Sequence, residues 1–393
     1  MTPSARVQGA IDLLDAIIAS ARTGGAAADV VATRYFKERR YAGGGDRRAI
    51  RDLTWRAIRR FGEVPETGRS AIVALADAGD ISADLFDGAG HGPAPIASDE
   101  PRAAGDLVPA WLRPLLDDRL TEADYEALLE RAPLDLRINR AREGRADLPE
   151  GEPLQPPLDG LRLPSDSAIL ETEAYRSGLV EVQDAGSQLI SAACAVRPGM
   201  TVVDLCAGAG GKTLALAAAM GGQGELVACD TDRRRLQEMP PRLQRAGVDI
   251  VEGRLLNPRR EWEALSDLEG ACDVVLVDAP CSGTGTWRRN PEGRWRLTPE
   301  RLQRLVDEQE RLLDIAAKLV ASDGVLVYAV CALTRCEGEG QVDAFLQRSN
   351  WKADKLMTAE GQGIQAGRPA GAGRLLTPLH DDCDGFFVAR LCR

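Results

Sequence analysis

Residues 201–213, TVVDLCAGAGGKT, constrain the fold of this chain more than any other stretch. An apolar run leads into Asp204, a loop of small residues follows, and the apolar run LALAAAM after Thr213 is rich in helix formers. A short buried strand, a glycine loop and a helix start form the unit that holds nucleotide-like cofactors in α/β proteins. Glycine lets the backbone approach such a ligand closely, because it has no Cβ.

Two phosphate-binding motifs fit this loop only in part. A P-loop, GxxxxGK[ST], needs a glycine where Cys206 stands, and a dinucleotide fingerprint, GxGxxG, needs one where Thr213 stands. A purely structural turn fits the same residues. The remaining interpretation is the strand and loop that S-adenosylmethionine-dependent methyltransferases use, and the loop alone leaves these alternatives open. The residues expected to contact such a cofactor are Cys206, Ala207, Gly208, Ala209, Gly210, Gly211 and Lys212, with Asp230 and Asp278 after later strands.

Strands and helices alternate regularly after residue 182. The helical period predicts a helix over residues 299–320, with Gln309 on its inner face. A last strand, antiparallel to its neighbour, is expected in DGFFVARLC. This alternation predicts an α/β domain built on a doubly wound, mostly parallel sheet. The expected parallel strands cover residues 201–205, 225–230, 248–252, 273–278 and 324–330.

The chain before this domain divides into a helical part and a mixed part. Apolar residues at helical spacing predict helices over residues 5–21 and 28–39, and a third that begins near Asp46 as its N-cap. A Gly-, Ala- and Pro-rich linker or loop covers residues 77–101, a helical pattern covers 111–130, and residues 133–139 alternate as a strand. The expected domains are a helical domain with linker over residues 1–95, a small α/β module over 96–178 and the sheet domain over 179–393.

The net charge of −11 argues against nucleic-acid binding, but its distribution is uneven. Between residues 34 and 60, ten basic residues face three acidic ones, which leaves +7 locally. We interpret this region as a surface that contacts RNA phosphates, for which Arg39, Arg40, Arg47 and Arg48 are the candidates. A solvated helical face is the alternative. Aromatic residues are few, so base stacking is not expected to be the main mode of binding.

Cysteine and histidine usage argues against a metal or disulfide scaffold. The nine cysteines are scattered without a CxxC pair, and the chain has two histidines. No apolar run of about 18 residues occurs, and the N-terminus lacks the pattern of an export signal. We therefore expect a cytoplasmic protein without a metal, and a monomer by default.

The expected strands end in residues that can do chemistry. Asp230 closes the second strand, where an acid can accept hydrogen bonds from ribose hydroxyls or cap a helix. Asp278-Ala-Pro-Cys281 closes the fourth strand and Cys331 follows the fifth, so these two cysteines are expected at one cleft. Cys194, Cys229, Cys272 and Cys392 are interpreted as small buried apolar residues.

Four arginines follow Cys281 closely. They suit phosphates beside a target nucleotide, and a solvated loop is the alternative. These residues are Arg288, Arg289, Arg294 and Arg296.

Several segments together resemble the RsmB/Sun-type RNA cytosine-5 methyltransferases of the NOL/NOP/Sun superfamily. The catalytic motifs are DLCAGAGGKT, VDAPCSGTGTWRRNPEGRW and VYAVCALTRCEGE, flanked by VQDAGSQL and LTPLHDDCDGFFVARL. DRRAIRDLTWRAIRR and APLDLRIN resemble the family's NusB-like helical domain and its small RNA-binding module. The resemblance spans nearly the whole chain. It implies a Rossmann-like methyltransferase domain, S-adenosylmethionine as cofactor, and RNA, in the first place ribosomal RNA, as substrate.

The resemblance also implies roles for single residues in making 5-methylcytosine. Cytosine C5 is too weak a nucleophile to take a methyl group until a thiolate adds to C6. Cys331 matches the nucleophile, and Cys281 matches the cysteine that assists release of the methylated RNA. Asp278 is expected to hold the pyrimidine edge, and Lys212 to support the pocket and favour a thiolate.

The chain departs from the family's usual motifs at a few positions. Ala209 replaces a proline in the glycine loop, Val330 and Ala332 flank Cys331 in place of Thr and Ser, and Arg254 stands where an acid is expected near the adenine. These departures leave open a non-catalytic RNA-binding or ribosome-assembly factor with the same fold. A transfer-RNA methyltransferase, or one acting on DNA or a small molecule, are further alternatives.

Overall fold

A computed structural model describes residues 1–144 and 146–393 of the chain. The described residues form two compact units: Met1–Glu130 with Trp287–Thr298, called the helical unit below, and Arg131–Thr286 with Pro299–Arg393, called the sheet unit. The division into three domains at residues 95 and 178 stays a prediction. Within the described residues, no helix is both long and apolar enough to cross a membrane.

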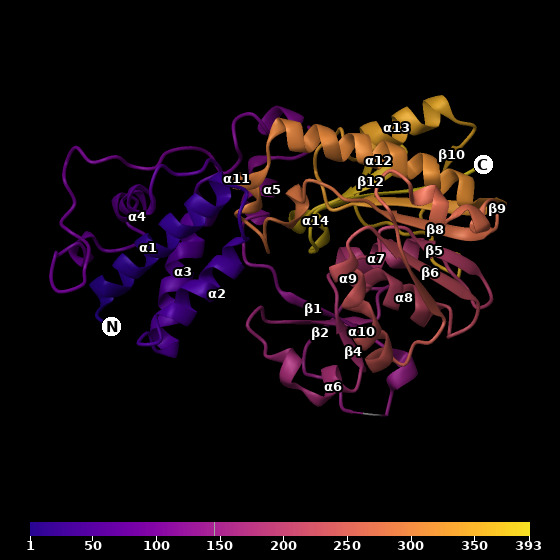
Figure 1. The fold of residues 1–393 in the computed structure, drawn as a ribbon, viewed down its shortest axis with the longest axis horizontal. Coiled ribbons are helices and arrows are strands. Elements are labelled where there is room, and N and C mark those ends of the chain that lie inside the picture. Colours follow the sequence, from indigo (N-terminus) through magenta and orange to yellow (C-terminus); the bar gives the residue numbers. More distant parts are fainter. Residues whose placement is uncertain (145) are drawn as a thin grey trace. The chain divides into compact units, whose positions relative to one another are not determined.

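The helical unit is built around α1, which packs against α2, α3 and α4 (Figure 1). Thr2 caps α1 by accepting a hydrogen bond from the Ala5 N–H at 3.2 Å, and Pro3 occupies the first turn, where no N–H is needed. Apolar residues at helical spacing fill the core, as the sequence predicts. The helices are α1 (Pro3–Arg22), α2 (Ala28–Glu38), α3 (Gly44–Arg60), α4 (Gly68–Asp77), α5 (Glu122–Ala127) and α11 (Gly293–Arg296), with short 3₁₀ turns η1 (Ala83–Leu85) and η2 (Arg113–Leu115).

Two local predictions in this unit are wrong. Gly43, not Asp46, caps α3; Asp46 lies in the first turn, and its carboxylate accepts a hydrogen bond from the Gly43 N–H at 3.1 Å. The expected helix over residues 111–130 is broken into η2 and α5, because Thr121 and Asp124 form a capping box that starts a new helix.

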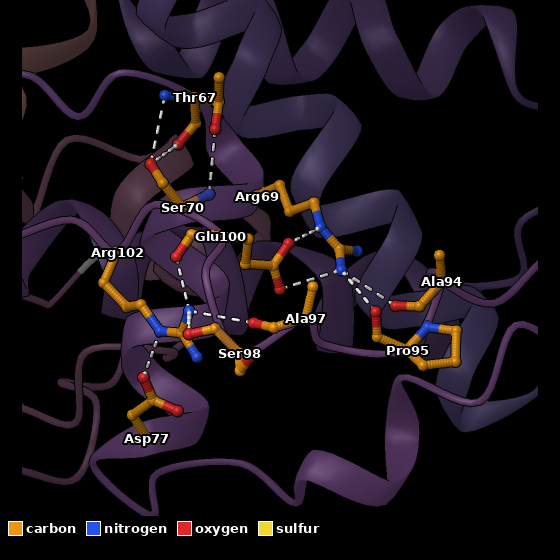
Figure 2. Close-up of polar contacts among 10 residues, drawn as sticks. All are labelled: Thr67, Arg69, Ser70, Asp77, Ala94, Pro95, Ala97, Ser98, Glu100 and Arg102. Atoms are coloured by element: carbon orange, nitrogen blue, oxygen red, sulfur yellow. Dashed lines mark hydrogen bonds and ion pairs between the residues drawn. The ribbon is translucent and has the colours of Figure 1, made fainter.

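The stretch over residues 77–101, expected as a linker or loop, is a long loop pinned to α4 by two arginines (Figure 2). Arg69 pairs with Glu100 at 2.8 Å and donates to the carbonyls of Ala94 and Pro95. Arg102 pairs with Asp77 at 2.9 Å and donates to backbone carbonyls of the loop. The loop therefore has fixed contacts although its only regular secondary structure is the short 3₁₀ turn η1.

Residues 287–298 belong to the helical unit, although they lie far along the chain. Trp295 is part of the core of this unit and donates its indole N–H to the Phe61 carbonyl at 2.9 Å. Arg294 is 2% exposed and donates to the carbonyls of Ile58, at 2.5 Å, and of Leu107. Burial lowers the pKa of Arg294 to about 9. Its guanidinium thus satisfies carbonyl groups that the interior would otherwise leave unpaired.

Replacing Arg294 by alanine should destabilise the helical unit by about 2–4 kcal/mol, because buried carbonyls lose their donors. Amide hydrogen exchange in α3 should measure this as faster opening. The matched control is Arg40→Ala, which removes an exposed arginine of the same unit. Equal exchange in the two variants would show that Arg294 does not stabilise the unit.

The sheet unit begins with a small antiparallel sheet in the order β2-β3-β1-β4. Asp135 of β1 is buried, pairs with Arg162 of β3 at 2.7 Å and accepts a hydrogen bond from the Ala185 N–H of α7 (Ala185–Ala193) at 3.0 Å. This buried acid therefore ties the small sheet to the first helix of the main sheet. The elements are β1 (Leu134–Ile138), η3 (Arg140–Arg142), β2 (Glu152–Pro153), β3 (Gly160–Leu163), η4 (Ile169–Glu171), α6 (Glu173–Arg176) and β4 (Val180–Val182).

The main sheet has the order β11-β12-β13-β9-β8-β5-β6-β7, and β10 pairs with β13. The five strands from β7 to β9 run parallel, and β13 is antiparallel to β9, which confirms the predicted α/β fold class. The order reverses between β5 and β8, which is the switch point of a doubly wound sheet. The strands are β5 (Thr201–Asp204), β6 (Glu225–Asp230), β7 (Val251–Leu255), β8 (Cys272–Asp278), β9 (Val320–Val330), β10 (Lys352–Asp354), β11 (Arg368–Ala370), β12 (Gly373–Leu376) and β13 (Phe386–Cys392).

Helices cover both faces of this sheet. Figure 1 shows α12 and α13 on one side of it and α7 and α8 on the other. The long α12 packs on β8 and β9, and α8 packs on β6. The helices are α8 (Gly211–Ala219), α9 (Arg233–Gln237), α10 (Met239–Ala246), α12 (Pro299–Leu319), α13 (Glu339–Arg348) and α14 (Pro378–Asp381), with 3₁₀ turns η5 (Glu261–Ala264), η6 (Ser266–Leu268) and η7 (Thr284–Thr286).

One predicted strand is displaced. The expected strand over residues 248–252 is observed as β7, which begins at Val251. The Val248 N–H instead donates to the Leu243 carbonyl at 3.0 Å, and Gly247 has the left-handed conformation that ends α10. Val248 therefore lies in a helix-capping turn and not in a strand.

Candidate active site

The parallel strands of the main sheet bring their carboxyl ends to one edge. Asp278, the last residue of β8, is paired in register with Ala329 of β9. The chain then leaves both strands at the same level, and the Ala279 N–H continues the pairing by donating to the Ala329 carbonyl at 2.9 Å. Residues that follow β8 and β9 must therefore lie close together.

The thiols of Cys281 and Cys331 meet at this edge, with 3.3 Å between their sulfur atoms. The Gly285 N–H donates to the Cys331 carbonyl at 3.0 Å, which fixes the two loops to each other. The hydrogen bond to Cys331, together with burial, raises the pKa of Cys281 well above its usual value. Cys281 therefore keeps its proton and can share it with Cys331.

Lys212 lies in the first turn of α8, directly after the glycine loop. Its ammonium group is 2.7 Å from the Asp278 carboxylate. Burial alone would lower the pKa of Lys212, but the charge and hydrogen bond of Asp278 outweigh it and Cys331 adds to their effect, so the pKa is raised. The site thus holds a buried positive charge beside two thiols and one carboxylate.

The glycine loop between β5 and α8 needs its glycines. Gly208 and Gly210 have φ angles of 57° and 85°, a conformation that other residues rarely adopt. A Cβ on Gly208 would lie 2.5 Å from the Arg235 guanidinium, and one on Gly210 would lie 2.7 Å from the Met239 side chain. Open space remains at Gly211, where nothing lies within 4 Å of an added Cβ. The loop therefore has room on one side and packs tightly on the other.

Asp230, at the end of β6, holds this loop in place. Its two carboxylate oxygens accept hydrogen bonds from the Gly208 and Asp232 N–H groups, each at 2.7 Å. Each oxygen keeps a second lone pair, so ribose hydroxyls can still donate to it. The open space at Gly211 and the remaining lone pairs of Asp230 fit a nucleoside-type cofactor, and Asp230 as its ribose partner stays a prediction.

Cys206 and Ala207, also expected at the cofactor, lie in the first turn of the same loop. The Ala207 N–H donates to the Cys229 carbonyl at 2.8 Å, and burial raises the pKa of Cys206, which keeps its proton. The Ala209 carbonyl accepts a hydrogen bond from Arg242 at 2.6 Å. This contact restrains the loop where the family usually has a proline.

Cysteines elsewhere in the sheet unit differ from this pair. Cys194, Cys229 and Cys272 are buried, and burial raises the pKa of each. They are packed as small apolar residues, as the sequence predicts, whereas the prediction is wrong for Cys392, which is half-buried at the end of β13. Within the described residues, no group of three or more His, Cys, Asp or Glu side chains is placed to hold a metal ion.

Two arginines after Cys281 do not have the expected role. Arg294 and Arg296 were expected to contact phosphates, but they donate to backbone carbonyls of the helical unit, Arg296 to Gly25 and Ala26 at 2.9 and 2.5 Å. Arg288 is 7% exposed, which leaves little of it for a phosphate, and Arg289 is half-buried. A run of arginines looks the same in sequence whether its partners are phosphates or carbonyls.

Arg254 lies within β7 and not after it. It pairs with Glu252 at 2.6 Å and with Asp267 at 2.8 Å, and donates to the Ala264 carbonyl at 3.1 Å. The position therefore carries a cation that is neutralised by neighbouring acids.

Glu337 is a further residue of this site, with no role predicted from the sequence. This residue is fully buried and accepts hydrogen bonds from Ser282, Gln309 and Thr334. Two features of the sequence point to such a contact. Glu337 is an acid shortly after Cys331, and Gln309 is an amide among apolar residues on the inner face of α12.

The strand order, the glycine loop after β5 and helices on both faces define a Rossmann-like S-adenosylmethionine-dependent methyltransferase. Residues 192–392 match the family model described as 16S rRNA methyltransferase RsmB/F. The chain belongs to this family, as the motifs predict.

Relatives with curated names cover most of the chain. The ribosomal RNA small subunit methyltransferase B of Xanthomonas campestris pv. campestris is 34% identical over 72% of this chain and 66% of its own length. That of Xylella fastidiosa is 34% identical over 72% of this chain and 68% of its own length. The chain thus spans about two thirds of the length of these relatives.

Solved structures agree on the fold. The crystal structure of PH0851 has a TM-score of 0.75 at 23% identity and covers 100% of this chain and 99% of its own. NSun6 from Pyrococcus horikoshii with SFG has a TM-score of 0.52 at 27% identity, with 60% of this chain and 59% of its own covered. S-adenosylmethionine is the cofactor that this family and fold support, which confirms the predicted cofactor. The NusB likeness of the helical unit stays a prediction.

Asp204, at the end of β5, offers a test of how the loop is built. It is 1% exposed; one oxygen accepts a hydrogen bond from Thr213 at 2.7 Å, and the other has no hydrogen-bond partner among the described residues. Burial raises the pKa of Asp204 to about 7.

Because the folded pKa lies above the unfolded value, Asp204 favours folding at low pH, and this stability is lost as the pH rises to about 7. The loss is about 1.4 kcal/mol for each pH unit between the unfolded and folded pKa values. Asp204→Asn should remove this part of the pH dependence. Melting temperatures between pH 5 and 8 measure it, and Asp249→Asn, at an exposed position, is the control. If both variants follow the unmodified protein, Asp204 does not titrate in this range.

Proposed function

We propose that this protein methylates C5 of a cytosine in RNA, and that its substrate is small-subunit ribosomal RNA. The observation that carries the proposal is the 3.3 Å approach of the Cys281 and Cys331 thiols beside the ion pair of Lys212 and Asp278. Family membership and the names of the relatives support ribosomal RNA as the substrate class. The target base must leave its stack to reach a site at this depth.

In the proposed reaction, the Cys331 thiolate adds to C6 of the cytosine, and the ring becomes an enamine whose C5 is nucleophilic. The positive charge of Lys212 favours the thiolate, and Asp278, whose side chain is 30% exposed, holds the pyrimidine edge and assists protonation of N3. The glycine loop and Asp230 would hold S-adenosylmethionine, which would supply an electrophilic methyl group for C5 when bound.

Release of the methylated RNA requires that a proton leave the ring and that the bond to Cys331 break. The C5 proton leaves to a base, the bond between Cys331 and C6 breaks, and the Cys331 sulfur departs as a thiolate. Cys281, which is protonated, assists this step by donating its proton to the departing Cys331 sulfur at 3.3 Å, and it regains the proton when Cys331 next becomes a thiolate. The two cysteines therefore have different roles in one catalytic cycle.

This assignment predicts opposite outcomes for two substitutions. Cys331→Ala should abolish methyl transfer, because no thiolate adds to C6. Cys281→Ala should leave addition intact and trap a covalent protein–RNA adduct, because release fails. Mass spectrometry of RNA after incubation with isotopically labelled S-adenosylmethionine, and gel shift under denaturing conditions, measure the two results.

Cys392→Ala, near the C-terminus, is the matched control and should behave like the unmodified protein. Like behaviour of the Cys331 and Cys281 variants would show that the role assignment is wrong. RNA binding without any label on cytosine C5 in the unmodified protein would favour an assembly factor instead. If transfer RNA or DNA takes up the label in a competition assay, that nucleic acid is the substrate in place of ribosomal RNA.

The helical unit supplies the proposed RNA contacts. At the junction of α2 and α3, Arg40 and Arg48 are exposed, as are Arg34 and Lys37 nearby. Arg39 lies with its guanidinium 3.8 Å from the Tyr35 ring centroid, and Arg47 donates to the Ala42 carbonyl at 2.9 Å. The exposed cations are therefore the better candidates for phosphate contacts, and Arg39 and Arg47 shape the surface.

The double substitution Arg40→Ala with Arg48→Ala should weaken RNA binding for all sequences alike. The slope of log Kd against log salt should fall by about 1 to 2, because each lost phosphate contact removes about 0.7 to 0.9. Filter binding across salt concentrations measures this. The control is Arg51→Ala on the same helix, where the arginine already pairs with Asp29 at 2.8 Å; an equal fall in both variants would place the RNA elsewhere.

A further inference from the structure

Glu337 is a buried acid that the proposed catalytic cycle does not use. Its side chain is fully buried, and no ion pair to it occurs in the part of the chain that the structure describes. A buried carboxylate without a cation is costly and is retained only when several hydrogen bonds satisfy it. The role of Glu337 can therefore be inferred from the groups that donate hydrogen bonds to it.

Four donors converge on its two oxygens. One oxygen accepts from the Ser282 N–H at 2.7 Å and from the Gln309 amide at 3.1 Å. The other accepts from the hydroxyls of Ser282 and Thr334, each at 2.5 Å. All four donors are neutral, so the lone pairs of the carboxylate are filled without a neighbouring cation.

These donors come from the loops that carry the two cysteines. Ser282 directly follows Cys281, and Thr334 lies three residues after Cys331. Gln309 adds a third element, α12, and also donates to the Pro280 carbonyl at 2.9 Å. Glu337 is thus the point at which both loops and the helix behind them are joined.

A second contact between the loops supports this arrangement. The Thr284 hydroxyl accepts a hydrogen bond from the Leu333 N–H at 2.7 Å. Without Glu337, this bond and the Gly285 contact to Cys331 would remain, but the residue next to Cys281 would lose both of its bonds to the second loop. The Cys281 side of the thiol pair therefore depends most directly on Glu337.

The charges around the thiol pair are unequal. Glu337 acts on the Cys281 side, where its negative charge adds to the effects of Cys331 and burial that raise the pKa of Cys281. Lys212, paired with Asp278, interacts with Cys331. A proton shared between the two sulfurs is therefore held at Cys281.

We propose that Glu337 is a positioning residue that fixes Cys281 against Cys331 and assigns the two thiols their roles, with Cys281 as the protonated partner. The role of this pair in catalysis rests on the proposed function. The placement and the charge of Glu337 act on the thiols with or without RNA, so the two proposals can be tested separately.

The first arm needs neither RNA nor cofactor. In a Cys331→Ser background, alkylation of Cys281 by iodoacetamide is followed by peptide mass spectrometry from pH 6 to 10. Adding Glu337→Gln, which keeps the shape and removes the charge, should move the profile to lower pH and speed labelling near neutral pH by about tenfold, which corresponds to one pKa unit.

Glu339→Gln is the matched control, because it makes the same chemical change two residues away at a half-buried position. Glu337→Asp keeps the charge and should restore the original profile in large part. An alkylation profile for Glu337→Gln that equals that of Glu339→Gln would overturn the proposal. Circular dichroism establishes that each variant is folded.

The second arm uses the full cycle. With Cys331 present, Glu337→Gln should accumulate a covalent RNA adduct and turn over slowly, as Cys281→Ala does, with KM little changed. Loss of RNA binding in place of adduct accumulation would overturn the proposal. If the unmodified protein transfers no methyl group, the proposed function fails while the alkylation arm still decides on Glu337.

Should Glu337→Gln not fold, Ser282→Ala gives the deciding measurement. It removes one of the donors from the Cys281 loop and leaves the carboxylate in place. Slower release with adduct accumulation supports the positioning role. Release and alkylation equal to those of the unmodified protein overturn it.

Discussion

The parallel pairing of β8 with β9 is the constraint on which the site depends. Both strands are buried along most of their length, and their register places Asp278 beside Ala329. Two parallel strands in register end at one level, so a residue after each must meet the other. This is why Cys281 and Cys331, separated by fifty positions in the chain, come within 3.3 Å. The glycine loop, Lys212 and Asp230 join them because β5 and β6 end at the same edge.

The sequence predicts the parts of this arrangement that depend on strand ends. Apolar runs mark the strands, glycines mark the loop, and a cysteine after each of two strands marks the thiol pair. It does not predict Arg294, because only the folded chain reveals that its partners are the Ile58 and Leu107 carbonyls. It misplaces β7, because Val248 fits a strand and a helix cap equally well. The role of Glu337 is not predicted for a similar reason, because its donors come from three separate segments of the chain.

The carboxyl ends of the strands carry three carboxylates that differ in their hydrogen-bond and ion-pair partners. Asp204 is buried with one unpaired oxygen, Asp278 pairs with Lys212, and Glu337 is filled by neutral donors. Each arrangement gives the carboxylate a different set of partners, and burying each one costs stability that the apolar sheet must offset. Together they separate a positive charge near Cys331 from a negative charge near Cys281. The fold thus makes two chemically identical side chains unequal.

The late segment in the helical unit has a consequence for the order of events during translation. The ribosome finishes α1 to α4 long before it reaches Trp295, which belongs to their core. Until then the core of these helices lacks the Trp295 indole, and the Ile58 carbonyl lacks its donor Arg294. The ribosome must also synthesise β5, β6 and β8 before it reaches that tryptophan. Completion of the helical unit therefore comes after most strands of the parallel sheet have been synthesised.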